Sequence, residues 1–191
     1  MGETNQRVAG IKGYSLLSSR NVVERFYGKA AVQKVIDALP PEDQVVFSNP
    51  ILSHAFYPLD AYVHWLEQEL RILYNGDQTI IESQFLRATE KAVKGIYGVV
   101  QRFGSPAEAV EKMGALRTLE NVRLERRPLG EGRVLLVFWG FEKRHAIFEV
   151  ALRCWWLTVA RMTGGKEVTF DARVPIANGK DRAEYLLTWT K

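Results

Sequence analysis

The stretch HAIFEVALRCWWLTVARMTG, residues 145–164, predicts one helix of about five turns around which the rest of the fold is organised. Its apolar side chains point almost all round the helix axis: Ile147, Phe148, Val150, Leu152, Cys154, Trp155, Trp156, Leu157, Val159 and Met162. A helix that is apolar on all sides is usually buried on all sides. Gly164 suits a left-handed C-cap, and Glu149 and Arg153 interrupt a run that is too short for an obvious membrane span.

Strand-like segments flank this helix, at residues 122–127 and 134–139 before it and at 168–174 and 185–189 after it. The run at 134–139 is apolar on both faces, which is typical of a covered central strand. Helical patterns are collected in the front half of the chain. The sequence therefore predicts an α+β fold in which an N-terminal helical layer packs on a C-terminal twisted antiparallel sheet, with the order β-β-α-β-β.

The front half is predicted to form helices at residues 21–27, 30–39, 58–74, 78–103 and 105–114. The longest of these has a clean helical stripe: Ile81, Phe85, Ala88, Ala92, Ile96, Val99 and Phe103. In residues 8–17, apolar and polar side chains alternate weakly, so this segment is interpreted as extended. Residues 44–56 fit either a short helix or a buried connection. We expect a flexible tail at 1–8 and a single domain at 9–191.

The composition is that of a globular protein, with 47% hydrophobic residues in a chain of 191 and one cysteine. A lone cysteine cannot form an internal disulfide, and no apolar signal core opens the chain, so a cytoplasmic setting is expected. The net charge of +4 comes from basic residues that are mixed with acidic ones. Binding to nucleic acid is disfavoured, because no helix is a basic ribbon and no strand has the pattern of an RNA-binding sheet.

The sequence contains none of the motifs that most directly indicate an enzyme: no GxxxxGKS/T, no GxGxxG after a strand, no GxSxG and no HExxH. Asp60, His64 and Glu67 share one helix face, where they fit a metal site or a solvated stripe with Asp60–His64 and Glu67–Arg71 pairs. Because helices commonly carry such stripes, we predict no metal site and assign no catalytic residue. Cys154 is expected to be an inert core thiol.

Aromatic residues are frequent enough to form a ligand pocket, a filled core or a subunit interface. The predicted walls of an apolar pocket are Tyr57, Trp65, Phe85, Tyr97, Trp139, Phe148, Trp155 and Trp156. The density of tryptophan favours the pocket, although a filled core is the commoner arrangement for such residues.

Short motifs along the chain carry a resemblance to a known family. They are Ile11-Lys12-Gly13, Tyr57-Pro58-Leu59-Asp60, Gly95-Ile96-Tyr97, Ser105-Pro106, and Glu184-Tyr185 with Trp189. In this order they resemble a family of small uncharacterised proteins known mainly from myxobacteria, which is similar to the 4-vinyl reductase domain, the haem–NO-binding domain and the TRAPP trafficking subunits. The resemblance covers residues 8–189. It implies a helical layer on a twisted antiparallel sheet, often dimeric, with an apolar cavity in some relatives.

Two cofactor patterns of these relatives are missing from this sequence. Zinc-binding relatives carry cysteines in the loop before the last strand, whereas residues 175–183 contain none. Haem-binding relatives use a proximal histidine near a Tyr-x-Ser-x-Arg motif, and the segment from Tyr14 to Arg20 has these letters in a different spacing. We therefore predict no cofactor and transfer no functional residue from the family.

Three hypotheses of function remain open. The preferred one is a non-enzymatic regulatory or sensory module that binds a small apolar ligand or a partner protein, as a homodimer. The second is a haem-based gas sensor that uses His54, His64 or His145. The third is a ligand-free scaffold for protein–protein interaction.

Overall fold

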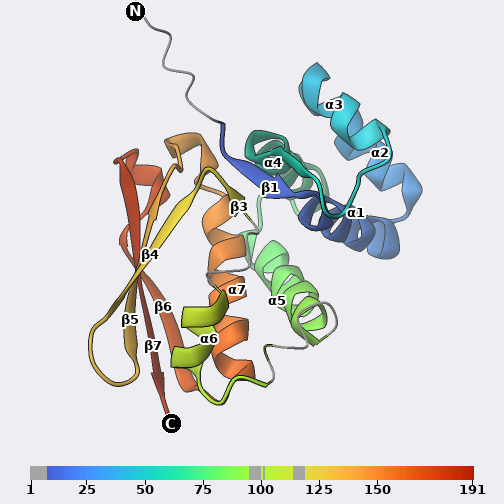
Figure 1. Ribbon diagram of the computed structural model, residues 1–191. Helices are drawn as coiled ribbons and strands as arrows, with labels where there is room; N and C mark the ends of the chain where they lie inside the picture. Colours follow the sequence, from blue (N-terminus) through green and yellow to red (C-terminus); the bar gives the residue numbers. More distant parts are fainter. Residues whose placement is uncertain (1–7, 95–99, 101, 114–118) are drawn as a thin grey trace, which may run out of the picture.

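The computed structural model describes residues 8–94, 100, 102–113 and 119–191. A helical layer covers one face of a four-stranded sheet (Figure 1). The helices are α1 (Gly13–Tyr27), α2 (Lys29–Asp37), α3 (Pro41–Ser48), α4 (Leu59–Leu73), α5 (Gln78–Lys94), α6 (Pro106–Met113) and α7 (Phe148–Met162). The strands are β1 (Gly10–Lys12), β2 (Phe56–Pro58), β3 (Leu119–Glu120), β4 (Arg123–Pro128), β5 (Arg133–Trp139), β6 (Lys166–Val174) and β7 (Arg182–Thr190). The predicted α+β class is confirmed.

The large sheet is antiparallel throughout and has the strand order β4-β5-β7-β6. Leu136 of β5 lies opposite Tyr185 of β7, and Phe170 of β6 lies opposite Leu187, so these buried side chains contribute to one core. Helix α7 follows β5 and precedes β6 in the chain. It is therefore the crossover of the β-β-α-β-β unit that the sequence predicted.

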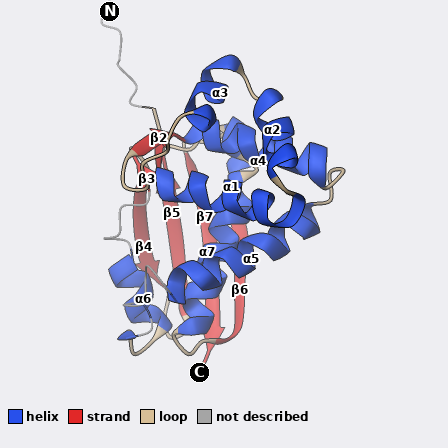
Figure 2. Cartoon of the chain, turned by 90° about the vertical axis from the view of Figure 1, so that its right-hand side faces the viewer, coloured by secondary structure: helices blue, strands red, loops and turns tan. Residues whose placement is uncertain are grey.

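Helix α7 lies between the sheet and α5, so both of its long sides are covered (Figures 1 and 2). Leu152, Trp156 and Val159 are at most 6% exposed, whereas Arg153 and Arg161 reach solvent. The all-round apolar pattern is thus explained by burial within the protein. Among the described residues, no helix has the length and apolar character needed to cross a membrane.

The first helix begins at Gly13, inside the segment 8–17 that the sequence indicated as extended, and only β1 remains of that extended segment. Glycine and serine are frequent in this stretch, and their low helix propensity concealed the helix. The backbone N–H groups of Gly13 and Tyr14 donate to the carbonyls of Ala55 (2.8 Å) and Ser53 (2.9 Å). Tertiary contacts therefore supply the acceptors that the N–H groups of a helix start otherwise lack.

Residues 44–56, for which the sequence left two interpretations, contain both a helix and a connection: residues 44–48 end α3, residues 49–55 form an irregular connection, and β2 begins at Phe56. Pro41 stands at the first position of α3, where a missing N–H costs nothing. Strand β2 then pairs with β1 in a small sheet that also contains β3. Residues 1–7 of the predicted tail lie outside the described residues. So do residues 95–99 and 101 of the predicted 78–103 helix.

Replacing Gly13 with alanine should lower the free energy of unfolding by about 1–3 kcal/mol, as overpacking typically does. A Cβ atom at this position would lie 2.7 Å from Tyr57 Cε2 and closer still to the Leu52 carbonyl oxygen. Urea denaturation measures the change. Gly104→Ala is the matched control, because its Cβ would meet only Glu108 Oε2 at 3.5 Å. Equal stability of the two variants would contradict this account of the α1 start.

Candidate functional site

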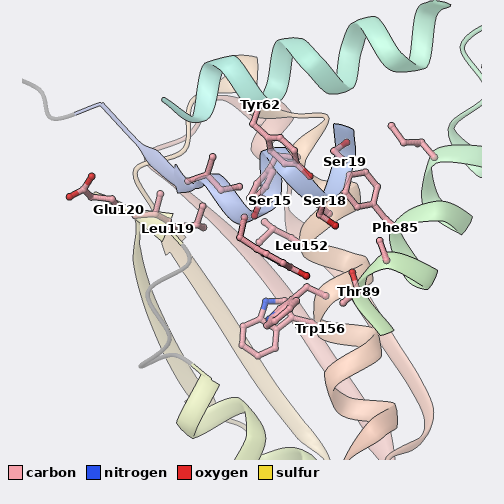
Figure 3. Close-up of a pocket in the computed structure, with 18 of the residues that line it drawn as sticks. Ser15, Ser18, Ser19, Tyr62, Phe85, Thr89, Leu119, Glu120, Leu152 and Trp156 are labelled. Carbon is pink, nitrogen blue, oxygen red and sulfur yellow. The ribbon is translucent and has the colours of Figure 1, made fainter. Parts of the chain in front are cut away.

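A cavity of about 570 Å³ lies between α1, α5 and α7, and residues of β3 and the start of β4 close one side of it (Figure 3). Ligand pockets in proteins typically measure about 300–1,000 Å³. The lining includes buried Glu69 of α4 and Glu120, an exposed residue of β3. The cavity therefore extends from the helical layer to the small sheet.

Three helices each turn one face to the cavity, and the lining residues recur at helical spacing. They are Tyr14, Ser15, Ser18, Ser19 and Val22 of α1; Ile81, Gln84, Phe85, Ala88 and Thr89 of α5; and Phe148, Ala151, Leu152, Trp155 and Trp156 of α7. In α5 and α7 the spacing is i, i+3, i+4, i+7 and i+8, which marks a single face. The α5 face contains three residues of the apolar stripe that the sequence predicted, Ile81, Phe85 and Ala88.

Small side chains on these faces explain why the space between the helices is not filled. Ser15 and Ser18 of α1, Ala88 of α5 and Ala151 of α7 all line the cavity. Protein interiors normally pack so closely that voids larger than a water molecule are few. An unfilled volume of this size favours a ligand pocket over a filled core as the role of the surrounding aromatic residues.

A buried carboxyl group contributes the most polar part of the lining. Glu69 is 2% exposed and accepts hydrogen bonds from Ser19 Oγ (3.1 Å), Trp65 Nε1 (2.9 Å) and Tyr74 OH (2.6 Å). Burial raises the pKa of Glu69 above its ordinary value, and this outweighs the lowering effect of the three donors. The Tyr74 hydroxyl also lies 2.7 Å from Gln84 Oε1, and its single proton cannot serve both acceptors.

One wall residue carries a hydrogen-bond donor that lacks an acceptor. Trp156 is 3% exposed, and its indole N–H has no partner in the part of the chain that the structure describes. A buried donor left unsatisfied costs about 1–3 kcal/mol. The Trp156 side chain lies at the cavity wall (Figure 3), and its covered nitrogen would have to turn toward the cavity to meet an acceptor on a bound molecule.

Four of the eight predicted pocket residues line the cavity: Phe85, Phe148, Trp155 and Trp156. Three others have different surroundings. Trp65 lies within the helical layer, where its ring stacks on Phe47 with the ring centres 4.6 Å apart. Trp139 lies under the Arg123 guanidinium, whose Cζ is 4.2 Å from the ring centre.

Tyr57 is the third of these, and it stabilises the connection before β2 instead of lining the cavity. Its hydroxyl oxygen accepts a hydrogen bond from the Leu52 backbone N–H at 2.9 Å. Tyr97, the last of the eight, lies outside the described residues. The cavity lining therefore includes both tryptophans of α7 from the predicted set.

Sequence reasoning missed most of the polar lining: Tyr14, Ser15, Ser18, Ser19, Tyr62, Glu69, Gln84, Thr89, Glu120 and Asn121. A signal existed for the serines, because Ser15, Ser18 and Ser19 recur at i, i+3 and i+4, but they lay in a segment interpreted as extended. Glu69 also carried a signal, since it continues an otherwise apolar helix face that includes Tyr62. An acid in such a stripe indicates a buried polar network.

The chain has three histidines, all within the described residues, and none of them lines the cavity. His145 is 2% exposed; its Nδ1 accepts a backbone N–H at 3.0 Å and its Nε2 lies 2.8 Å from Asp60 Oδ1. His64 Nδ1 lies 2.6 Å from Asp43 Oδ2, and His54 is exposed. The two partnered histidines therefore join elements of the fold to one another.

The predicted Asp60–His64 pair is not formed, because both residues pair with other elements. Asp60 Oδ1 lies 2.8 Å from Arg144 Nε as well as 2.8 Å from His145 Nε2. In the described part of the chain, no group of three or more His, Cys, Asp or Glu could hold a metal ion. Burial raises the pKa of the Cys154 thiol to about 12, which agrees with an inert core thiol.

No family model and no curated protein matches this sequence. Solved structures nevertheless resemble it over nearly its whole length. An H-NOX protein from S. oneidensis in the Fe(II)NO ligation state is 12% identical, with a TM-score of 0.70 over 95% of this chain and 100% of that one. The Fe(II) unliganded H-NOX protein from K. algicida is 13% identical, with a TM-score of 0.63 over 95% and 97% of the two chains.

A sequence identity of 12–13% shows a shared fold and does not show a shared function. Of the relatives that the sequence resemblance suggested, the haem–NO-binding domain is the one that these matches support. The links to the myxobacterial family, the 4-vinyl reductase domain and the TRAPP subunits stay predictions. The chain therefore has an H-NOX-like fold, with its cavity between the helices α1, α5 and α7.

Proposed function

We propose that this chain is a non-catalytic sensory domain that binds a small molecule in the cavity between α1, α5 and α7. The observation that carries the proposal is the cavity itself, about 570 Å³ between three helices whose facing side chains leave it open. A concave site that combines aromatic and aliphatic walls with polar side chains is typical of small-molecule binding. The H-NOX-like fold supports the same conclusion, because the similar structures include one in an Fe(II)NO ligation state.

Haem-based gas sensing is the second candidate, and the fold likeness favours it over the other ligands that the sequence suggested. The resemblance to H-NOX structures extends over 95% of the chain, so the likeness is not limited to one motif. The candidate therefore depends on whether the described lining can hold a haem.

The described lining does not fit a histidine-ligated haem. Protein ligands to haem iron are histidine, cysteine, methionine and tyrosine side chains. Among the described lining residues, only Tyr14 and Tyr62 belong to this group, and burial raises the pKa of Tyr62 well above its ordinary value, which keeps its phenol neutral. Haem also carries two anionic propionates, and the described lining has Glu69 and Glu120 but no lysine or arginine.

A haem titration tests the two candidates against each other. Adding haem to the purified protein should give only the broad absorption of free or loosely bound haem, because none of the three histidines lines the cavity. The measurement is the absorption spectrum at increasing haem, under reducing conditions with and without NO. A sharp Soret band that saturates at one haem per chain would establish the haem sensor in place of our proposal.

The homodimer, the partner protein and the cytoplasmic setting expected from the sequence stay predictions. A homodimer would be seen as a doubled mass in size-exclusion chromatography with light scattering. The ligand-free scaffold remains the alternative in which the cavity has no occupant. Ligand binding that depends on a cavity residue distinguishes the sensory domain from that scaffold.

A further inference from the structure

We infer that the cavity selects an uncharged, largely aromatic molecule that carries a hydrogen-bond acceptor, such as a ketone, ester or amide. The indole N–H of Trp156 donates a hydrogen bond to this acceptor. The inference rests on the proposed function and specifies the class of ligand. Three features of the described residues carry it: the unpartnered indole N–H, the charge of the lining, and the aromatic walls.

The indole N–H of Trp156 defines the polar contact. It is buried and unpartnered among the described residues, although the side chain lies on the cavity wall. Indole nitrogen only donates, so its partner must be an acceptor and cannot be an ammonium or another N–H group. The nitrogen is covered in this structure, so we expect the indole ring to move slightly when an acceptor binds.

The charges of the described lining disfavour an anion. The acidic residues of the described lining are Glu69 and Glu120, and none of the described lining residues is lysine, arginine or histidine. A carboxylate or phosphate on the ligand would therefore lose its hydration without gaining a cation. Glu69 already accepts three hydrogen bonds, from Ser19, Trp65 and Tyr74, so it does not require a cationic ligand to compensate it. An uncharged ligand is the class that fits both observations.

The walls favour a flat aromatic body over a long flexible chain. Phe85, Trp155, Phe148 and Phe138 bring aromatic surface to the cavity from three different elements. Aromatic pairs gain free energy beyond the area they bury when they stack or meet edge to face. A rigid ring system also loses little conformational entropy on binding. The cavity volume of about 570 Å³ leaves room for two or more fused rings.

Three naphthalene probes with one ring system test the inference by equilibrium dialysis. Acetonaphthone carries a neutral ketone, isopropenylnaphthalene replaces the ketone oxygen with a carbon of similar shape, and naphthoate carries an anion. We expect acetonaphthone to bind about tenfold more tightly than isopropenylnaphthalene, since one net hydrogen bond is worth about one tenfold step. Naphthoate should bind on the order of a hundredfold more weakly than acetonaphthone, because its charge is desolvated without a partner.

Trp156→Phe keeps an aromatic ring and removes the donor, so it should abolish the preference for the ketone while isopropenylnaphthalene still binds. Trp139→Phe is the matched control and should keep the preference, because Trp139 packs under Arg123 outside the cavity. Binding of the neutral probes without a preference for the ketone, or with naphthoate bound equally well, would overturn the inference alone. Failure of every probe to bind the wild-type protein would overturn the proposed function as well. The wild-type ranking keeps the test decisive even if Trp156→Phe does not fold.

Discussion

Replacing Glu69 with leucine is expected to lower the free energy of unfolding by about 1–3 kcal/mol, because the buried Ser19 hydroxyl loses its acceptor. Ser19 Oγ and Trp65 Nε1 both donate to Glu69 Oε2, at 3.1 and 2.9 Å, and both donors are buried. Trp65 and Tyr74 each keep an acceptor in the variant, because Ser19 Oγ lies 3.0 Å from Trp65 Nε1 and Gln84 Oε1 lies 2.7 Å from the Tyr74 hydroxyl. Urea and thermal denaturation measure the change, with about 2–4 °C of melting temperature per kcal/mol for a chain of this size.

Glu69→Gln is the matched control, because it keeps a carbonyl acceptor at the same position and removes the ionisable group. This variant should be destabilised by less than half as much as Glu69→Leu. Equal losses in the two variants would contradict the role given to the hydrogen bonds and would instead indicate a defect of packing.

A comparison of the wild type with Glu69→Gln tests the titration of the buried carboxyl. The pKa of Glu69 is raised in the folded protein, so the folded state holds its proton more tightly than the unfolded chain does. The free energy of unfolding of the wild type should therefore fall as pH rises from the ordinary value of 4.5 through the raised value. Glu69→Gln lacks this titration, so the wild-type advantage should shrink over that window. A constant difference across the pH series would contradict the raised pKa.

Replacing Ala88 with tryptophan is expected to weaken the binding of acetonaphthone on the order of a hundredfold or more, which is a loss of at least about 2.7 kcal/mol. Ala88 lies in the middle of the α5 face that lines the cavity, so a large ring at this position occupies the space that a ligand needs. Because the ring enters open volume, stability should change by no more than the about 1–3 kcal/mol of ordinary overpacking. Equilibrium dialysis and urea denaturation measure the two quantities.

Ser83→Trp is the control for this variant, because Ser83 lies on the exposed side of the same helix. It adds the same ring without entering the cavity and should leave acetonaphthone binding within about twofold of wild type. If Ala88→Trp folded normally and still bound the probe as tightly as Ser83→Trp did, the ligand site would lie elsewhere.

The architecture could be predicted from the sequence because its patterns are local. The apolar run at 134–139 and the alternation at 168–174 mark strands, and the all-round apolar run at 145–164 marks a covered helix. The start of α1 could not be predicted in this way. Its acceptors, the carbonyls of Ser53 and Ala55, are distant in the sequence, and they override the low helix propensity of the residues at 13–19.

The site was harder to predict than the fold, for two physical reasons. Aromatic residues of the same type serve different roles: Trp156 lines the cavity, whereas Trp65 stacks on Phe47 and donates to Glu69. Only the packing of helices against one another separates the two. A cavity, moreover, forms where side chains are small. The sequence alone does not show that a small residue such as Ser15 or Ala88 leaves space open beside it.

The central claim is that a small molecule binds in this cavity, and the indole N–H signals of the five tryptophans test it most directly. In a two-dimensional NMR titration of the wild-type protein with acetonaphthone, the cross-peaks of Trp155 and Trp156 should move, because both residues line the cavity. The cross-peak of Trp139 should stay in place, because this residue packs under Arg123 and does not line the cavity. Saturation with no movement at Trp155 and Trp156, or movement at Trp139 instead, would contradict the account.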